Sequence, residues 1–222
     1  MNVDVVADAE TAASRGAEAI AAAAAESVAA RGRFSLAVSG GHGPWRMFEL
    51  LGRDEIDWPR VTVFQVDERV APDGDDDRNL THLVPSLPAA GRERVVPMPV
   101  TDDDLEAAAA RYGEELPQPL DLVHLGLGPD GHTASLIPGD PVLEVIDRPV
   151  ATTGEYQGRR RMTLTDPVLA AARQILWLVT GDDKVDALAK LRAGDRSIPA
   201  GRVRSDDATL VCDRDAAGPS AG

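Results

Sequence analysis

Apolar and polar positions along the chain predict helices that alternate with short strands. The alanine-rich residues 8–30 contain no proline and a single glycine, which favours one long helix. Further helices are expected at 45–51, 102–115 and 183–191. Short apolar runs, typical of buried strands, lie at 34–38, 61–66, 120–127, 162–164, 174–180 and 209–212. This alternation predicts an α/β fold with an open, largely parallel sheet flanked by helices, a Rossmann-like arrangement.

The chain shows no internal repeat and no linker between its periodic segments. Its 222 residues are enough for one large domain with a buried core. We therefore expect a single α/β domain over residues 1–214. The last residues, 215–222, are expected to form a flexible tail.

The charge of the chain limits the partners that it can have. Lys and Arg number 23 against 37 Asp and Glu, so the formal net charge is −14. Such a surface repels nucleic acid and anionic lipid, and neither is expected as a partner. No run of about 18 uncharged apolar residues predicts a membrane-spanning helix, and no basic N-terminal segment predicts a secretory signal. Cys212 is the only cysteine, which excludes an internal disulfide and indicates a cytoplasmic protein.

Three polar or glycine-rich clusters directly follow predicted strands, at 39–44, 67–69 and 128–135. In an open α/β sheet, ligands bind beyond the carboxyl ends of the strands. The clusters are therefore expected to converge on one pocket, and this convergence is the main reason to expect an enzyme.

The first cluster reads Ser39-Gly40-Gly41-His42-Gly43-Pro44 and stands between a strand and a helix. Glycines let the backbone approach a ligand closely, and free N–H groups at a helix start favour an anion such as phosphate. The alternative is an ordinary tight turn between strand and helix.

The second cluster, Asp67-Glu68-Arg69, offers two carboxylates and one guanidinium at a strand end. An arginine in this position can bind an anion or polarise a carbonyl. The alternative is a solvated strand end held by salt bridges.

The third cluster presents His132 directly after a tight glycine turn. A histidine titrates near neutral pH and suits general base catalysis, and Asp130 is placed to orient it. The alternative is a histidine that caps the following turn. Residues 126–131 match G-x-G-x-x-G, but Pro129 inside the loop argues against a dinucleotide fingerprint.

The other histidines are weaker candidates for chemistry. His124 lies within an apolar strand and is expected in the core, and His82 is expected on a helix face. Two cations, Arg161 and Lys184, are plausible partners for a phosphate on so acidic a chain, the alternative being surface solvation.

No metal site is predicted. Asp73, Asp75 and Asp77 begin with calcium-loop spacing, but Arg78 and Val84 stand where the loop needs glycine and glutamate. The segment is better interpreted as a solvated acidic loop. No His, Cys or Asp set has zinc spacing, and no cofactor is implied.

In order and spacing, these motifs resemble the 6-phosphogluconolactonase family, within the broader glucosamine-6-phosphate isomerase/deaminase-like group. The resemblance covers nearly the whole chain, to about residue 217, and is carried by 39–44, 67–69, Asn79, 126–139, 161–165 and 181–184. The D-G-H-T-A-S-L block at 130–136 is the most specific part. Two departures matter: His42-Gly43 replaces the family's Ser-Thr, and Arg78 replaces a serine before Asn79.

The resemblance implies hydrolysis of 6-phospho-D-glucono-1,5-lactone to 6-phospho-D-gluconate, in the oxidative pentose phosphate pathway. It makes His132 the base that activates water and Asp130 its positioning partner, with Arg69 and Asp67 facing the sugar ring or the lactone. The phosphate would be held by Ser39, Gly40, Gly41, His42, Gly43, Arg161 and Lys184. A lactone is an activated ester, so water and a positioned base suffice without a metal or covalent nucleophile.

Three alternatives remain beside this interpretation. A glucosamine-6-phosphate deaminase has D-E-Y in place of residues 67–69 and a glutamate where this chain has Ile137. A catalytically weakened sugar-phosphate-binding paralogue is suggested by the His42-Gly43 change. A sugar-phosphate sensor would need a helix-turn-helix segment, for which the chain has no room. We expect a monomer or homodimer whose partner is a small phosphorylated sugar lactone.

Overall fold

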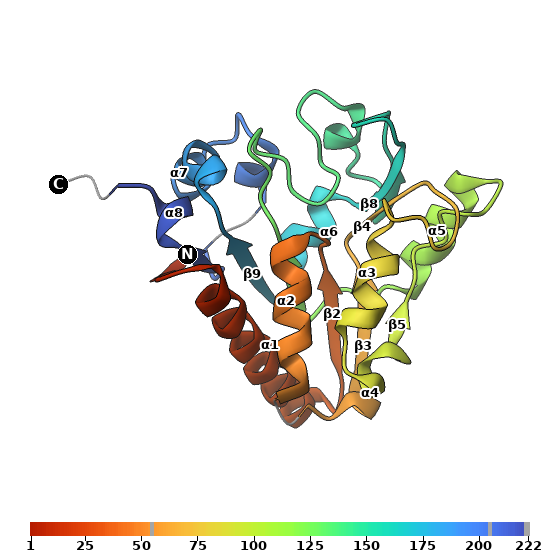
Figure 1. Ribbon diagram of the computed structural model, residues 1–222. Helices are drawn as coiled ribbons and strands as arrows, with labels where there is room; N and C mark the ends of the chain where they lie inside the picture. The colour runs from red at the N-terminus through yellow and green to blue at the C-terminus, as the bar shows by residue number, and fades with distance from the viewer. Residues whose placement is uncertain (54–55, 204–205, 220–222) are drawn as a thin grey trace.

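The protein is described here by a computed structural model, which covers residues 1–53, 56–203 and 206–219 (Figure 1). Its main sheet contains β1 (Asn2–Val6), β2 (Phe34–Val38), β3 (Val61–Gln65), β5 (Val95–Val96), β6 (Leu122–Leu125), β9 (Gln174–Val179) and β10 (Thr209–Asp213). Within the described residues these seven strands run parallel in the order β1-β10-β9-β6-β2-β3-β5. After β2, the chain adds β3 and then β5 on one side of it. The later strands β6, β9 and β10 extend the sheet on the other side of β2.

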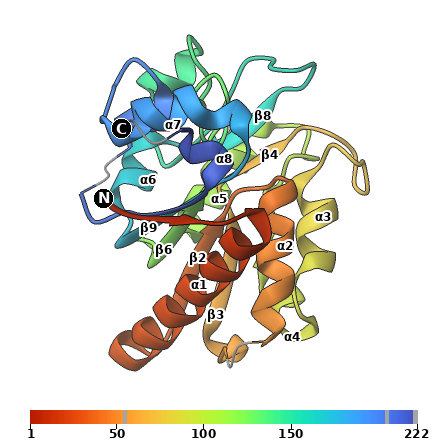
Figure 2. The same cartoon turned by 60° about the vertical axis from the view of Figure 1, so that its left-hand side comes forward.

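Helices cover both faces of this sheet. They are α1 (Ala9–Arg31), α2 (His42–Leu50), α3 (Asn79–Ser86), α4 (Ala89–Arg92), α5 (Leu105–Glu115), α6 (Asp166–Ala171), α7 (Val185–Arg192) and α8 (Arg214–Ala217). Figures 1 and 2 show α1, α2 and α3 side by side over one face. The buried residues of α5, α6, α7 and α8 pack in a separate cluster against the other face. None of the helices within the described residues is long and apolar enough to span a membrane.

Alternate residues of each central strand enter different cores. Leu36 of β2 packs with α1 and α2, whereas its neighbour Ala37 joins the cluster that contains α5 and α7. The same alternation separates Leu176 from Trp177 on β9. Because both faces are covered, the central strands are buried along most of their length and are largely apolar, which explains the hydrophobic runs in the sequence.

A second, smaller sheet lies at the carboxyl ends of the main strands. It contains β4 (Asp67–Arg69), β8 (Arg161–Leu164) and β7 (Val150–Thr152), paired antiparallel in the order β4-β8-β7. The backbone N–H of Leu164 donates to the carbonyl of Val66 at 2.7 Å, which ties this sheet to the end of β3. Two cationic residues predicted to bind ligand, Arg69 and Arg161, are thereby placed opposite each other in register.

The predicted α/β class is confirmed, with corrections at several element boundaries. The segment 162–164 was expected as a strand of the sheet and 67–69 as a polar cluster at the end of a strand, but the two segments pair with each other in the small sheet. Helix α2 begins at His42 rather than at 45, and α5 begins at Leu105 rather than at 102 because the Asp104 side chain caps it.

The expected start of the flexible tail at residue 215 is also wrong. Asp213 accepts a hydrogen bond from the backbone N–H of Ala216 at 2.8 Å, so the next turn of chain folds as α8. Ala216 is fully buried against the core. The last three residues of the expected tail, 220–222, lie outside the described residues.

The amino ends of the central strands are held by a buried carboxylate. Asp121 precedes β6 and accepts hydrogen bonds from both the backbone N–H and the hydroxyl of Ser35, each at 2.9 Å. Its other oxygen pairs with Arg31 of α1 at 2.9 Å and lies 3.5 Å from Arg173. Asp121 lies at the amino end of β6, whereas the polar cluster at 128–135 follows the carboxyl end. We therefore expect Asp121 to contribute to stability and not to ligand binding.

We predict that Asp121→Ala lowers the free energy of unfolding by about 2–4 kcal/mol, because Ser35 loses its buried acceptor and Arg31 its partner. Denaturant unfolding would measure the loss, with Asp103→Ala, at an exposed position, as the control. The folded Asp121→Ala protein should keep the ligand affinity of the wild type. Equal stability of the two variants would contradict this role for Asp121.

Candidate active site

A cleft of about 390 Å³ opens where four neighbouring strands end. It is bordered by the segments that follow β9, β6, β2 and β3, which are adjacent in the sheet. The order of strands reverses between β2 and β6, the usual location of a ligand site in an open α/β sheet. Its lining residues include Ser39, Gly40, Gly41, Gly43, Asp67, Arg69, Asn79, His132, Arg161 and Lys184. The structure thus brings the three sequence clusters together.

The glycine-rich segment forms the floor of the cleft and the first turn of α2. Gly41 has a φ of 128°, a value that favours glycine, and no side chain caps the helix after it. The first N–H groups of α2 therefore have no acceptor within the helix and are available to an anion. The hydroxyl of Ser39 donates to the carbonyl of His124 at 3.2 Å, so Ser39 belongs to the wall. The side chain of His42 lies outside the described part of the structure.

Because Gly40 has no side chain, Asn79 of α3 can approach the floor of the cleft closely. A Cβ at this position would lie 2.0 Å from Oδ1 of Asn79. Asn79 is buried, and its Nδ2 donates to the backbone carbonyl of Asp67 at 3.0 Å. Glycine is thus required at position 40 by this contact with Asn79 as well as by ligand access.

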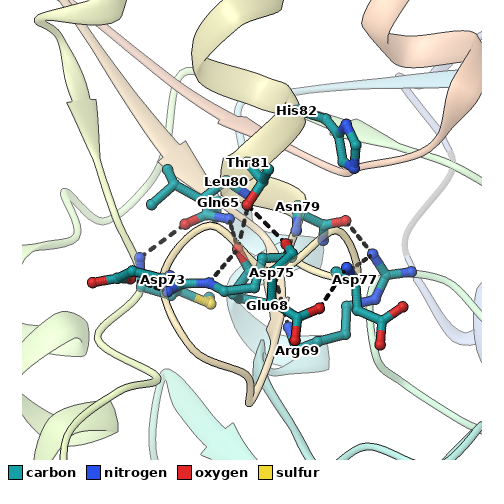
Figure 3. A network of polar contacts seen from close by, with 12 residues as sticks. Gln65, Glu68, Arg69, Asp73, Asp75, Asp77, Asn79, Leu80, Thr81 and His82 are labelled. Carbon is teal, nitrogen blue, oxygen red and sulfur yellow. Dashed lines mark hydrogen bonds and ion pairs between the residues drawn. The ribbon is translucent and has the colours of Figure 1, made fainter.

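A fully buried carboxylate, Glu68, organises the entrance between β4 and α3 (Figure 3). It accepts four hydrogen bonds from N–H donors at 2.7–2.8 Å, given by the backbone of Arg69, Asn79 and Leu80 and by the side chain of Gln65. Two of these donors belong to the first turn of α3, where a negative charge also favours the helix dipole. Glu68 therefore joins the end of β3 to the start of α3.

This network fixes the two residues that flank Glu68. Nη1 of Arg69 donates to Oδ1 of Asn79 at 2.5 Å and to the carbonyl of Asp77 at 3.1 Å. Asp67 is almost fully buried and accepts a hydrogen bond from the hydroxyl of Ser135 at 2.6 Å. A guanidinium and a carboxylate are thus held at the cleft wall in fixed orientations.

His132 and Asp130 form a hydrogen-bonded pair on the opposite side. Nδ1 of His132 lies 2.6 Å from Oδ1 of Asp130, which also accepts the backbone N–H of His132 at 3.1 Å. Burial of Asp130 opposes its ionisation, but the bonds from His132 and from Tyr156 outweigh that effect and lower the pKa of the carboxyl. An ionised carboxylate only accepts hydrogen bonds, so Nδ1 carries the proton and Nε2 is left as the basic nitrogen of a residue that lines the cleft.

The close approach of the pair depends on Gly128. A Cβ there would lie 2.1 Å from Nδ1 of His132 and 2.7 Å from Oδ1 of Asp130. The backbone N–H of Gly128 donates to the carbonyl of His132 at 2.8 Å, which closes the loop. The G-x-G-x-x-G match in this segment therefore serves a tight turn around a histidine.

Two further cations reach the cleft. Arg161 on β8 is buried, and burial lowers the pKa of its guanidinium while nearby Asp67 raises it. Lys184 follows β9 and pairs with Asp183 at 2.8 Å, with 20% of its side chain exposed. The preceding loop is anchored by Gly181, whose N–H donates to the Asp213 carboxylate.

The remaining candidates lie where the sequence analysis expected them or have structural partners. His124 is fully buried, its pKa lowered by burial to about 3, and His82 lies on α3 at the surface. The acidic loop is less solvated than expected, because Asp75 and Asp77 both pair with Arg159. Across the described ranges, no three His, Cys, Asp or Glu side chains are grouped to hold a metal ion.

Comparison with known proteins agrees with this arrangement. A family model described as glucosamine-6-phosphate isomerases/6-phosphogluconolactonase matches residues 7–212. The chain belongs to this family. A 6-phosphogluconolactonase of Nostoc sp. is 32% identical over 204 residues, with 86% of this chain and 85% of the relative covered. One from Rhizobium meliloti is 39% identical over 170 residues, covering 72% and 73%.

A solved structure extends the agreement to the fold. The crystal structure of a 6-phosphogluconolactonase from Shewanella baltica superposes with a TM-score of 0.85 at 26% identity, covering 96% of this chain and 98% of that one. The resemblance predicted from the motifs is thereby confirmed.

One departure from the family pattern gains a structural explanation. Arg78, which stands in place of a serine, is almost fully buried and forms ion pairs with Asp73 and with Glu68, whose Oε2 lies 3.7 Å from its Nε. It therefore balances part of the buried charge of Glu68. Neither of these contacts could be inferred from the sequence.

Several residues that hold the side chains of the cleft in place were not assigned a role from the sequence. Glu68, Ser135 and Asn79 stand inside or beside recognised motifs, so their positions could have suggested them. Tyr156 stands in no motif, yet its hydroxyl donates to Asp130 at 3.0 Å. Only the structure shows its contact with Asp130.

We predict that Glu68→Gln lowers the free energy of unfolding by about 2–3 kcal/mol, because the amide nitrogen cannot accept the N–H groups that the carboxylate accepts. Denaturant unfolding of this variant and of the exposed control Glu93→Gln would measure the difference. A variant as stable as the control would show that the bonds to Glu68 contribute nothing net.

Proposed function

We propose that this chain hydrolyses 6-phospho-D-glucono-1,5-lactone to 6-phospho-D-gluconate. The observation that carries the proposal is the pair of His132 and Asp130, 2.6 Å apart, in a cleft whose floor is an uncapped helix start. The first feature supplies a base and the second receives an anion. The names of the relatives support the same reaction.

In this mechanism His132 acts on water. Nε2 takes a proton from the water as its oxygen forms a bond to C1 of the lactone, and the carbonyl oxygen becomes an oxyanion. The intermediate then collapses with cleavage of the bond between C1 and the ring oxygen, which receives the proton from His132. Asp130 holds Nδ1 throughout and stabilises the transient imidazolium.

The other cleft residues divide between the two ends of the substrate. We assign the phosphate to the backbone of 39–43, to Arg161 and to Lys184, because a dianion needs N–H groups and cations. Arg69 is assigned to the developing oxyanion. Asp67 is assigned to a sugar hydroxyl, for which its buried carboxylate is an acceptor.

The alternatives have less support. A deaminase of the glucosamine-6-phosphate type would carry an acid at position 137, but this chain has Ile137, which is buried. A weakened paralogue was suggested by His42-Gly43, yet the backbone of the helix start remains available to phosphate. A cytoplasmic location forms part of this proposal, in keeping with a free and buried Cys212, and a monomer or homodimer stays a prediction.

Lactone hydrolysis tests the proposal directly. The lactone would be generated in situ with glucose-6-phosphate dehydrogenase, and the product followed with excess 6-phosphogluconate dehydrogenase. We expect the wild type to exceed spontaneous ring opening and His132→Ala to lose at least about 100-fold in kcat, the effect of removing a general base. A wild type that only matches the spontaneous rate would refute the proposed activity.

The phosphate assignment predicts a different kinetic effect for Lys184. Lys184→Ala should raise KM for the lactone about tenfold with little change in kcat, because a charge-assisted contact to the non-reacting end is lost. The matched control is Lys190→Ala, which alters the chain's only other lysine at an exposed position of α7. Unchanged KM in Lys184→Ala, or an equal rise in both variants, would contradict the assignment.

A further inference from the structure

Tyr156 contacts the hydrogen-bonded pair of His132 and Asp130, although it belongs to none of the recognised motifs. It lies between β7 and β8, and its hydroxyl donates to Oδ2 of Asp130 at 3.0 Å. Because Oδ1 of the same carboxylate holds Nδ1 of His132, the two oxygens have separate partners. The tyrosine therefore limits rotation of the carboxylate that orients the base.

The ring of Tyr156 makes two further contacts. It lies edge-on to the imidazole of His132, with centroids 5.5 Å apart. The guanidinium of Arg161 lies over the same ring, 5.0 Å from its centroid, within the range of a cation–π contact. One side chain thus contacts the base, its carboxylate partner and a cation assigned to the phosphate.

The backbone that carries Tyr156 is itself fixed. Tyr156 and Arg159 exchange backbone hydrogen bonds at 2.9 and 3.3 Å across a two-residue turn. Gln157 and Gly158 have φ values of 53° and 79°, the positive signs that a type I′ turn requires. Arg159 extends the anchoring by its ion pairs with Asp75 and Asp77.

We propose that Tyr156 is a positioning residue of the hydrolysis, which orients Asp130 and His132 through its hydroxyl and Arg161 through its ring. The proposal rests on the proposed function of the cleft. Burial and the bond to Asp130 both raise the pKa of the phenol, so the hydroxyl remains a donor across the neutral range.

The two contacts have separable kinetic consequences. Tyr156→Phe removes the hydroxyl and keeps the ring, so kcat should fall about tenfold, the effect of one hydrogen bond to a charged group, while KM stays unchanged. Tyr156→Leu removes the ring as well, and KM should also rise about fivefold as Arg161 loses its support. If Tyr156 only stabilised the fold, the two variants would not differ in this way, with kcat alone changed in one and both kcat and KM changed in the other.

The experiment compares these two variants with Tyr112→Phe in the same coupled lactone assay. Tyr112 is the chain's other tyrosine, and its buried hydroxyl bonds only to backbone groups of the described residues, at Gln65 and Val96. Tyr112→Phe should lower thermal stability and leave kcat and KM as in the wild type. Wild-type kcat in Tyr156→Phe, or equal kinetics in all three variants, would overturn the proposal.

A second readout separates this proposal from the proposed function. The Nδ1 proton of His132, bonded to a carboxylate, gives a downfield proton resonance that His132→Ala identifies by its absence. Tyr156→Phe should shift or broaden this resonance, and Tyr112→Phe should not. If the wild type fails to accelerate hydrolysis, the proposed function fails, and the resonance alone then decides the role of Tyr156: an unchanged signal in Tyr156→Phe refutes it.

Discussion

The buried carboxylate of Glu68 is the constraint on which one wall of the cleft depends. Removing a charge from water is costly unless every lone pair finds a partner, and Glu68 finds four N–H donors and lies beside Arg78. These donors come from β3, β4 and α3, so satisfying the charge fixes three elements together. One result is the fixed orientation of the Arg69 side chain, which donates to Asn79. Another is the close approach of Asn79 to Gly40. Stability and ligand geometry thus have a common physical origin.

The opposite wall of the cleft is likewise held by a carboxylate, that of Asp130, which has fewer partners than Glu68. Asp130 remains ionised because His132 and Tyr156 donate to it, and its charge in turn fixes the tautomer of the imidazole. Between the walls, a chain with a net charge of −14 gathers Arg69, Arg161 and Lys184 at one cleft. An acidic protein can therefore receive an anionic substrate through local charge, while its outer surface stays repulsive to larger polyanions.

The sequence was sufficient to predict the fold class, because hydrophobic runs reflect strands buried on both faces. It also placed His132, Asp130 and the glycine-rich segment at strand ends, and the structure brings these into one cleft. The small antiparallel sheet was missed because strands of three or four residues leave no periodic pattern. Tyr156 was missed because its role depends on a turn that brings together residues 26 positions apart, and no local pattern encodes that contact.

We infer that one cleft orients a phosphorylated lactone between a phosphate-binding end and the base His132. A crystal structure of the wild type with 6-phospho-D-gluconate tests this orientation most directly. We predict the phosphate at the start of α2 beside Lys184 and Arg161, with the C1 carboxylate within hydrogen-bond distance of Nε2 of His132. A product bound in the reverse direction, or bound outside the cleft, would contradict it.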